Sequence, residues 1–144
     1  VVHNNDQVFD IRKPIKIKEG RDLCILSTGH ILPFTQKVAQ SLQELGVSAE
    51  IHSVPMVKPL PSDDILALSK KFTSFVTLEE HSVVGGFGSA VAELFADHGL
   101  KHTALLRYGT PDRFLKGLGE GHHAYDLVGL NKEYIAQDIL KRLG

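Results

Sequence analysis

The stretch Leu23-Cys24-Ile25-Leu26, together with the residues from Pro33 to Val54 that follow it, decides the fold class of this chain. The four-residue apolar run is typical of a strand that is buried on both faces. From Pro33 to Leu45 apolar residues recur at helical spacing, and Gly46 provides a stop for the helix. Val47 to Val54 alternates as a strand does. A strand, a helix and a second strand in succession predict parallel strands with helices packed on their sheet.

The same alternation continues to the end of the chain. Ser62 is a suitable N-cap for a helix whose first turn holds Asp63 and Asp64. Further expected elements are a strand at Phe75–Leu78, a helix at Phe87–His98 that stops at Gly99, a strand at Ala104–Leu106 and a helix at Lys132–Leu143. The interior strands of the sheet are expected at Leu23–Leu26, Ile51–Val54 and Phe75–Leu78.

One more strand is expected at an edge of the sheet, close to the start of the chain. Ile15 and Ile17 alternate there with Lys16 and Lys18, so the isoleucines should face the core and the lysines should point away from it. The fold class predicted from these patterns is α/β, with a mainly parallel sheet covered by helices on both faces.

Composition excludes several classes of function. The 144 residues suffice for one domain with a substantial core, and a net charge of −1 gives no sequence-independent attraction to nucleic acid or to an anionic membrane. No apolar run approaches the roughly 20 residues of a transmembrane helix. Cys24 is the only cysteine, which excludes an internal disulfide and suits a reducing compartment such as the cytoplasm.

The chain begins with Val1, and its only methionine is Met56, so we expect it to be a piece of a longer polypeptide. Residues 1–12 are predicted to be a linker that arrives from an upstream domain. Residues 13–144 are predicted to form a single domain.

The stretch from Glu79 to Ala90 is the first candidate for a functional site. It runs from a strand end through a glycine-rich loop into a helix N-terminus, which is an arrangement that can hold an anion. It does not fit the dinucleotide fingerprint, because Val91 stands where a third glycine or an alanine is needed. The alternative interpretation is that the glycines permit a tight turn and close packing of helix against sheet, and we favour it. The candidate residues in this loop are Gly85, Gly86, Gly88 and Ser89.

Glu80 and His81 offer either an acid–base pair or polar contacts at an interface. No serine or cysteine is placed to act as a nucleophile beside them, and without an HxxxH or CxxC pattern a structural zinc site is not expected. Arg113 is a candidate ligand for a phosphate or carboxylate, or else part of a local turn with Asp112. Because Arg113 is the only cation expected near the loop while Glu79 and Glu80 oppose an anion, we predict a contact surface rather than an anion site.

Several short motifs occur in an order that resembles the third, C-terminal domain of the transketolase superfamily. They are Lys18-Glu19-Gly20-Arg21-Asp22, Ser27-Thr28-Gly29, Val57-Lys58-Pro59-Leu60, Val76-Thr77-Leu78-Glu79-Glu80-His81, Gly85-Gly86-Phe87-Gly88-Ser89-Ala90-Val91-Ala92-Glu93, Pro111-Asp112-Arg113-Phe114 and Gly129-Leu130. The resemblance runs from Phe9 to Leu143 and is greatest to the C-terminal subunits of split transketolases. Deoxyxylulose-phosphate synthases and the β subunits of 2-oxoacid dehydrogenases are the alternative branches, and a free-standing anion-sensing module is an alternative of another class.

The resemblance implies a three-layer α/β/α fold with a mixed, mainly parallel sheet of about five strands, one of them antiparallel. It also implies that thiamine diphosphate and magnesium are held elsewhere in the parent enzyme, by a Gly-Asp-Gly motif that this chain lacks. No catalytic, cofactor-binding or metal-binding residue is therefore assigned here. The implied partners are the diphosphate- and pyrimidine-binding domains or subunit of the same enzyme, in a dimer or other homo-oligomer.

Overall fold

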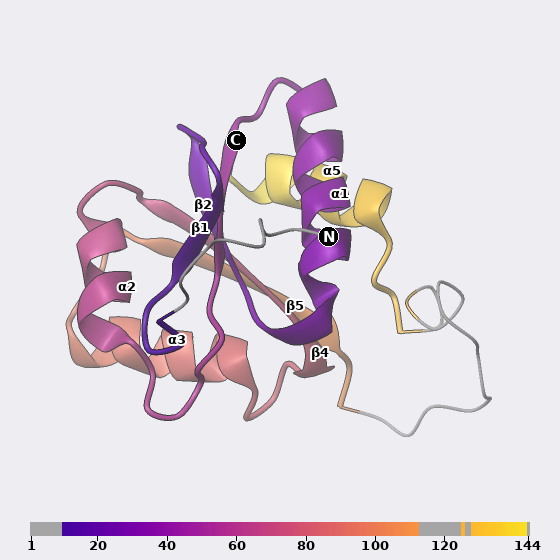
Figure 1. Cartoon of the computed structure of the whole chain (residues 1–144). Coiled ribbons are helices and arrows are strands. Elements are labelled where there is room, and N and C mark those ends of the chain that lie inside the picture. The colour runs from indigo at the N-terminus through magenta and orange to yellow at the C-terminus, as the bar shows by residue number, and fades with distance from the viewer. Residues whose placement is uncertain (1–9, 113–124, 126–127, 144) are drawn as a thin grey trace.

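The computed structural model describes residues 10–112, 125 and 128–143. These residues form five strands and their covering helices, and Figure 1 shows the sheet between two helical layers. The strands are β1 (Ile15–Lys18), β2 (Leu23–Ser27), β3 (Ala49–Ser53), β4 (Ser74–Ser82) and β5 (Ala104–Thr110). The helices are the short 3-10 helix η1 (Gly29–Ile31) and the α-helices α1 (Leu32–Glu44), α2 (Ser62–Ser69), α3 (Phe87–Asp97) and α5 (Lys132–Leu143).

The strand order in the sheet is β1-β3-β2-β4-β5. β1 pairs antiparallel with β3, whereas β2, β3, β4 and β5 are parallel to their neighbours. The predicted α/β class, the five-stranded mixed sheet and the single antiparallel strand are confirmed. The three predicted interior strands are also the three interior strands of this sheet.

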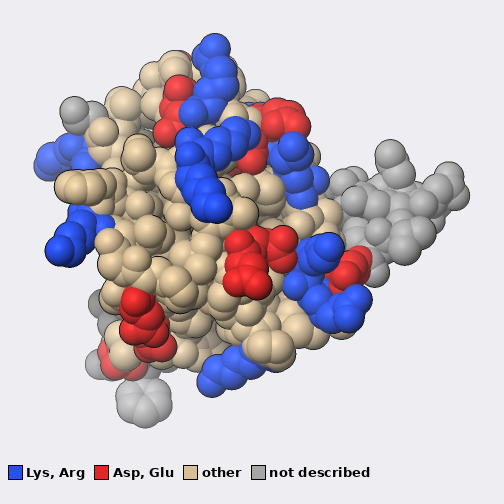
Figure 2. Space-filling view, turned by 90° about the vertical axis from the view of Figure 1, so that its left-hand side faces the viewer, with Lys and Arg blue, Asp and Glu red and all other residues tan. Residues whose placement is uncertain are grey.

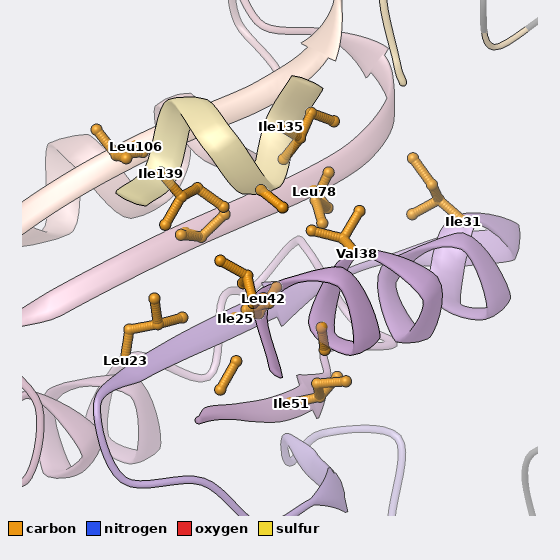
Figure 3. Packing of buried hydrophobic residues seen from close by; sticks show 14 of the residues in the cluster. Leu23, Ile25, Ile31, Val38, Leu42, Ile51, Leu78, Leu106, Ile135 and Ile139 are labelled. Carbon is orange, nitrogen blue, oxygen red and sulfur yellow. The ribbon is translucent and has the colours of Figure 1, made fainter. Parts of the chain in front are cut away.

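One face of the sheet packs against α1 and α5, which lie side by side (Figure 1). Figure 3 shows how their apolar side chains meet those of the strands that the two helices cover. Each such side chain contributes roughly 1.5–3 kcal/mol when it leaves water. The cluster includes Leu23, Ile25, Val38, Leu42, Ile51, Leu78, Leu106, Ile135 and Ile139.

The other face of the sheet packs against α2 and α3. Four phenylalanines belong to this second core, where Phe75 and Phe95 meet edge to face with ring centroids 5.1 Å apart. The remaining members are aliphatic or small residues of β2, α2, α3 and the segment that follows β3. They include Cys24, Leu26, Ile65, Val91 and Leu94. Cys24 is fully buried, and burial raises the pKa of its thiol far above the usual range, as expected for an inert core cysteine.

The predicted ends of some elements were wrong. Ser62 is not the N-cap of α2; Pro61 holds that position, and the Ser62 hydroxyl donates to the Leu60 carbonyl instead. β4 continues four residues past the predicted Leu78, because its polar end still pairs with β5 at Ser82 and Thr110. Polar residues at a strand end do not show in an apolar pattern, so the strand appeared shorter than it is.

The prediction for β1 holds in part. Lys16 is exposed and Ile17 packs against the first core. Lys18 is half-buried rather than fully turned to solvent. The pairing with β3 shifts between Lys16 and Lys18, and this irregularity breaks the strict alternation of the two faces.

Charged side chains are dispersed over the one face that Figure 2 draws. On the face that carries α2 and α3, Figure 2 shows blue and red groups interspersed, with neither sign covering the view. Among the described residues, no helix combines the length and the apolar character that crossing a membrane requires.

Candidate functional site

The carboxyl edge of the sheet is organised by Glu79, near the end of β4. Its side chain is only 1% exposed, and its two carboxylate oxygens accept the backbone N–H groups of Phe87 at 2.7 Å and of Gly88 at 2.8 Å. These amides belong to the first turn of α3. The first N–H groups of a helix have no acceptors within the helix, and the N-terminus carries a partial positive charge. A carboxylate from the neighbouring strand therefore already occupies the position at which an external anion would bind.

The glycines around Glu79 are required by close approach of the chain. A Cβ on Gly86 would lie 2.2 Å from a Glu79 carboxylate oxygen and 2.3 Å from the Ser82 carbonyl oxygen. A Cβ on Gly88 would lie 2.5 Å from the Thr77 hydroxyl oxygen. Gly85 is different, because it has open space around it and a positive φ of +72°. The geometry supports the interpretation of this loop as a tightly packed turn.

The loop is tied down a second time by Arg107 of β5. Its guanidinium donates to the Val83 carbonyl at 3.0 Å and to the Ser89 hydroxyl at 2.9 Å. The Ser89 hydroxyl also donates to the Val83 carbonyl, and it accepts the Gly85 N–H at 3.1 Å. The prediction that Arg113 is the only cation near the loop was wrong. Arg107 was missed because it lies inside a strand 18 residues from Ser89, although parallel pairing of β4 and β5 places it beside the loop.

Glu80 and His81 do not form the acid–base pair that was considered. Neighbouring residues of a strand point to opposite faces of a sheet. Glu80 lies on the α1 side, where it accepts a hydrogen bond from the Tyr125 hydroxyl, and His81 lies on the α3 side. Burial and then the hydrogen bond to Glu80 raise the pKa of Tyr125 to about 12. Arg113, the remaining candidate, lies outside the described residues.

A cleft of about 390 Å³ opens on the α3 side of this edge. It lies between the segment that follows β3 and the N-terminal half of α3, and Thr28 and Glu79 form part of its lining. His81, Gly85, Gly86 and Ser89 also line it, so the cleft brings together four of the predicted site residues. Glu80 lies on the other face, and Gly88 is buried beneath the loop.

A second buried carboxylate lies away from this edge, on β3. Glu50 is 2% exposed; its oxygens are 2.6 Å from Lys71 Nζ and 2.8 Å from His52 Nε2. Burial opposes the charge of Glu50, but the hydrogen bonds from Lys71 and His52 outweigh it and hold the pKa of this carboxyl below its ordinary value. Sequence reasoning missed this cluster because its members lie 19 to 21 residues apart along the chain or alternate within an apolar strand. Among the described residues, no three His, Cys, Asp or Glu side chains are grouped to hold a metal ion.

Comparison with known proteins agrees with this architecture. Residues 13–135 match the family model of the transketolase C-terminal domain. A Methanocaldococcus jannaschii protein provisionally named transketolase C-terminal section is 36% identical over 145 residues, which cover 99% of this chain and 44% of that protein. The 1-deoxy-D-xylulose-5-phosphate synthase of Rippkaea orientalis is 39% identical over 125 residues, which cover 87% of this chain and 19% of the synthase. The chain thus spans less than half the length of either relative.

Solved structures show the same fold. A split-gene transketolase, described as an inactive β4 tetramer, superposes with a TM-score of 0.86 at 26% identity, over 99% of this chain and 46% of that one. The Pichia stipitis transketolase in complex with sedoheptulose 7-phosphate superposes with a TM-score of 0.59 at 14% identity, over 92% of this chain and 18% of the transketolase. The second likeness supports the fold alone. Since the family model matches most of the chain and the sheet and helices agree with it, the chain belongs to the transketolase C-terminal domain family.

Proposed function

We propose that this chain is the non-catalytic C-terminal domain of a thiamine-diphosphate-dependent enzyme that transfers ketol groups between sugar phosphates. The observation that carries the non-catalytic role is the capping of α3 by Glu79, because this carboxylate fills the place where a phosphate would bind the helix. Glu80 and His81 lie on opposite faces of the sheet, so these two polar groups do not converge on one reacting atom.

The contribution of the domain is contact with the rest of the enzyme. Val84, at the tip of the loop after β4, is 62% exposed, although the loop itself is held by Glu79 and Arg107. An exposed apolar side chain on a preorganised loop binds a neighbour at little cost in ordering. The proposed contact surface consists of Glu80, His81, Val84, Gly85, Gly86, Gly88 and Ser89, with the last three supporting the exposed groups from behind.

The cofactors are assigned to other parts of the parent enzyme. We expect thiamine diphosphate and magnesium to be held by the diphosphate- and pyrimidine-binding domains or subunit, since the described part of this chain offers no grouped metal ligands. Residues 1–12 are proposed to be the linker to those domains, and residues 13–144 the domain itself. A dimeric or other homo-oligomeric cytoplasmic enzyme completes the proposal.

A second candidate is the corresponding domain of a deoxyxylulose-phosphate synthase. The observation in its favour is the 39% identity to the Rippkaea orientalis synthase, which is similar to the 36% identity to the archaeal transketolase section. The two candidates share the fold and the contact role. They differ in the reaction of the complete enzyme.

The test uses the complete enzyme, or this chain combined with the subunit that carries the missing domains. Ketol transfer from a ketose phosphate to an aldose phosphate is measured beside formation of 1-deoxy-D-xylulose 5-phosphate. We expect ketol transfer by the complete enzyme and none by this chain alone. Formation of deoxyxylulose phosphate instead identifies the second candidate. Turnover by the pure chain, or its binding of thiamine diphosphate with micromolar affinity in a titration, contradicts the non-catalytic role.

The contact surface is tested with Val84→Asp in the complete enzyme. Assembly, measured by sedimentation velocity, should weaken because a charge replaces an apolar contact. Tyr134→Asp is the matched control, since Tyr134 on α5 is also 61% exposed but lies outside the proposed surface. If only Tyr134→Asp weakened assembly, the contact would lie on α5 and the proposed surface would be wrong.

A further inference from the structure

The topology of the sheet has a switch point between β2 and β4. The connection that leaves β2 crosses on the face of α1, whereas the connection that leaves the adjacent β4 crosses on the face of α3. Two neighbouring parallel strands whose connections leave to opposite faces open a crevice at their carboxyl ends. In open α/β sheets, ligands bind in this crevice.

The cleft of about 390 Å³ lies at this switch point. Thr28 follows β2 directly, and His81 belongs to the end of β4. Val57, Phe87 and Ala90 add apolar walls from the segment before α2 and from α3. The volume falls within the range of about 300–1,000 Å³ that is usual for small-ligand sites, and mixed polar and apolar walls are also usual there.

Three polar side chains of this cleft are free to meet a ligand. In the part of the chain that the structure describes, no hydrogen bond or ion pair engages the Lys58 ammonium, the His81 imidazole or the Glu93 carboxylate. Lys58 stands on the segment before α2, whereas Glu93 stands on α3. The cleft thus presents the Lys58 donor on the segment before α2, the His81 imidazole at the end of β4 and the Glu93 acceptor on α3.

The charges of the cleft select against strongly anionic ligands. Glu79 of β4 brings a carboxylate to the cleft and occupies the first amides of α3. Glu93, on α3 itself, adds a second carboxylate. Among the described residues that line the cleft, Lys58 is the only permanent cation, and the Arg107 guanidinium behind the loop is already engaged by Val83 and Ser89, so a phosphate would meet the two carboxylates with one free cation. A ligand that satisfies the free groups carries one acid group for Lys58 and one ammonium for Glu93, with an apolar portion for the remaining walls.

We propose that this cleft binds a small zwitterion with an apolar side chain, of the α-amino-acid class. The carboxylate of the ligand pairs with Lys58 and is within the reach of His81 as a second donor, and its ammonium pairs with Glu93. This function goes beyond the contact role proposed above. The cleft shares His81, Gly85, Gly86 and Ser89 with the proposed contact surface, whereas Lys58 and Glu93 belong to the cleft and not to that surface. It does not depend on which reaction the complete enzyme catalyses.

The test is a screen of the L-amino acids against the complete protein at millimolar concentration, by ligand-observed NMR and calorimetry. We expect binding by members with apolar side chains. Lys58→Met and Glu93→Gln should each weaken the affinity about tenfold or more, because each removes one charged partner of the ligand. Lys70→Met and Glu44→Gln are the matched controls, since both residues are exposed and lie outside the cleft, and they should leave the affinity unchanged.

Analogues separate the two charges. The corresponding carboxylic acid without the amino group should be sensitive to Lys58→Met only, and the corresponding amine to Glu93→Gln only. The proposal is overturned if no amino acid binds, or if both variants bind as the parent does. It is also overturned if inorganic phosphate binds more tightly than any amino acid and depends on Lys58 alone, because the cleft is then an anion site. None of these results alters assembly or ketol transfer, so failure here is distinct from failure of the proposed function.

Discussion

Glu79 is the residue on which the start of α3 and the glycine loop depend, and its replacement tests the account of this edge. In Glu79→Ala the N–H groups of Phe87 and Gly88 lose both acceptors while they remain buried. A hydrogen bond to a charged group contributes about 1.5–3 kcal/mol, so the loss of two such bonds should lower the free energy of unfolding by about 3–6 kcal/mol. Glu79→Gln keeps one acceptor oxygen and should lose about half as much.

The measurement is denaturant unfolding of the complete protein, with hydrogen–deuterium exchange to locate the effect. Exchange should accelerate first at the N-terminal turn of α3, since its amides lose their partners. Glu44→Gln, an exposed glutamate of α1, is the control and should stay within about 0.5 kcal/mol of the parent. Sulfate should stabilise Glu79→Ala more than the parent, because the substitution opens the anion position at the helix. A loss below about 1 kcal/mol with unchanged exchange in α3 would refute the capping role.

Three further predictions concern other polar groups and the glycines. Glu50→Gln should lower the free energy of unfolding by about 1–3 kcal/mol at neutral pH. Because the pKa of Glu50 is lowered in the folded protein, its contribution to stability is present above the unfolded pKa and is lost as pH falls below about 4.5. Unfolding measured across pH should therefore show the stabilities of the two proteins converge in acid. Glu80→Gln should move the pKa of Tyr125 down from about 12, measured by ultraviolet difference absorbance, since the neighbouring charge no longer opposes the phenolate. Gly86→Val should destabilise the domain more than Gly85→Ala, because the valine side chain would displace Glu79. Gly85→Ala only strains a backbone with positive φ, at a cost of about 1–2 kcal/mol. Thermal unfolding compares the two variants, and equal losses of stability would contradict the close packing at Gly86.

Much of the fold was predictable because apolar periodicity reports burial directly. The helix at Lys132–Leu143 and the core of each interior strand lie where the patterns placed them. A side chain that faces the core in either element must be apolar, and the period of 3.6 or 2 residues follows from backbone geometry alone. The resemblance to the transketolase C-terminal domain added that one strand runs antiparallel, which periodicity does not specify.

The candidate site was predictable only in outline. The stretch from Glu79 to Ser89 was recognised as important, but only half of the role of Glu79 was predicted: it was considered a charge that repels an anion, and it is also the ligand of the helix itself. That role depends on the β4–α3 turn, which brings a carboxylate back onto amides eight and nine residues away. No local sequence pattern specifies how the turn places the start of α3 against Glu79.

The sequence by itself determined which segments are strands and helices, which of their faces are buried, and to which family the chain is similar. Only the tertiary structure decided which polar groups meet. Arg107 reaches Ser89 because β5 pairs in parallel with β4, and Tyr125 reaches Glu80 across 45 residues of sequence. The physical reason is that the burial of a side chain depends on its own polarity and on its position in the repeat of one helix or strand. A hydrogen bond between distant residues is instead a property of two elements, and the register that joins them exists only in the folded sheet.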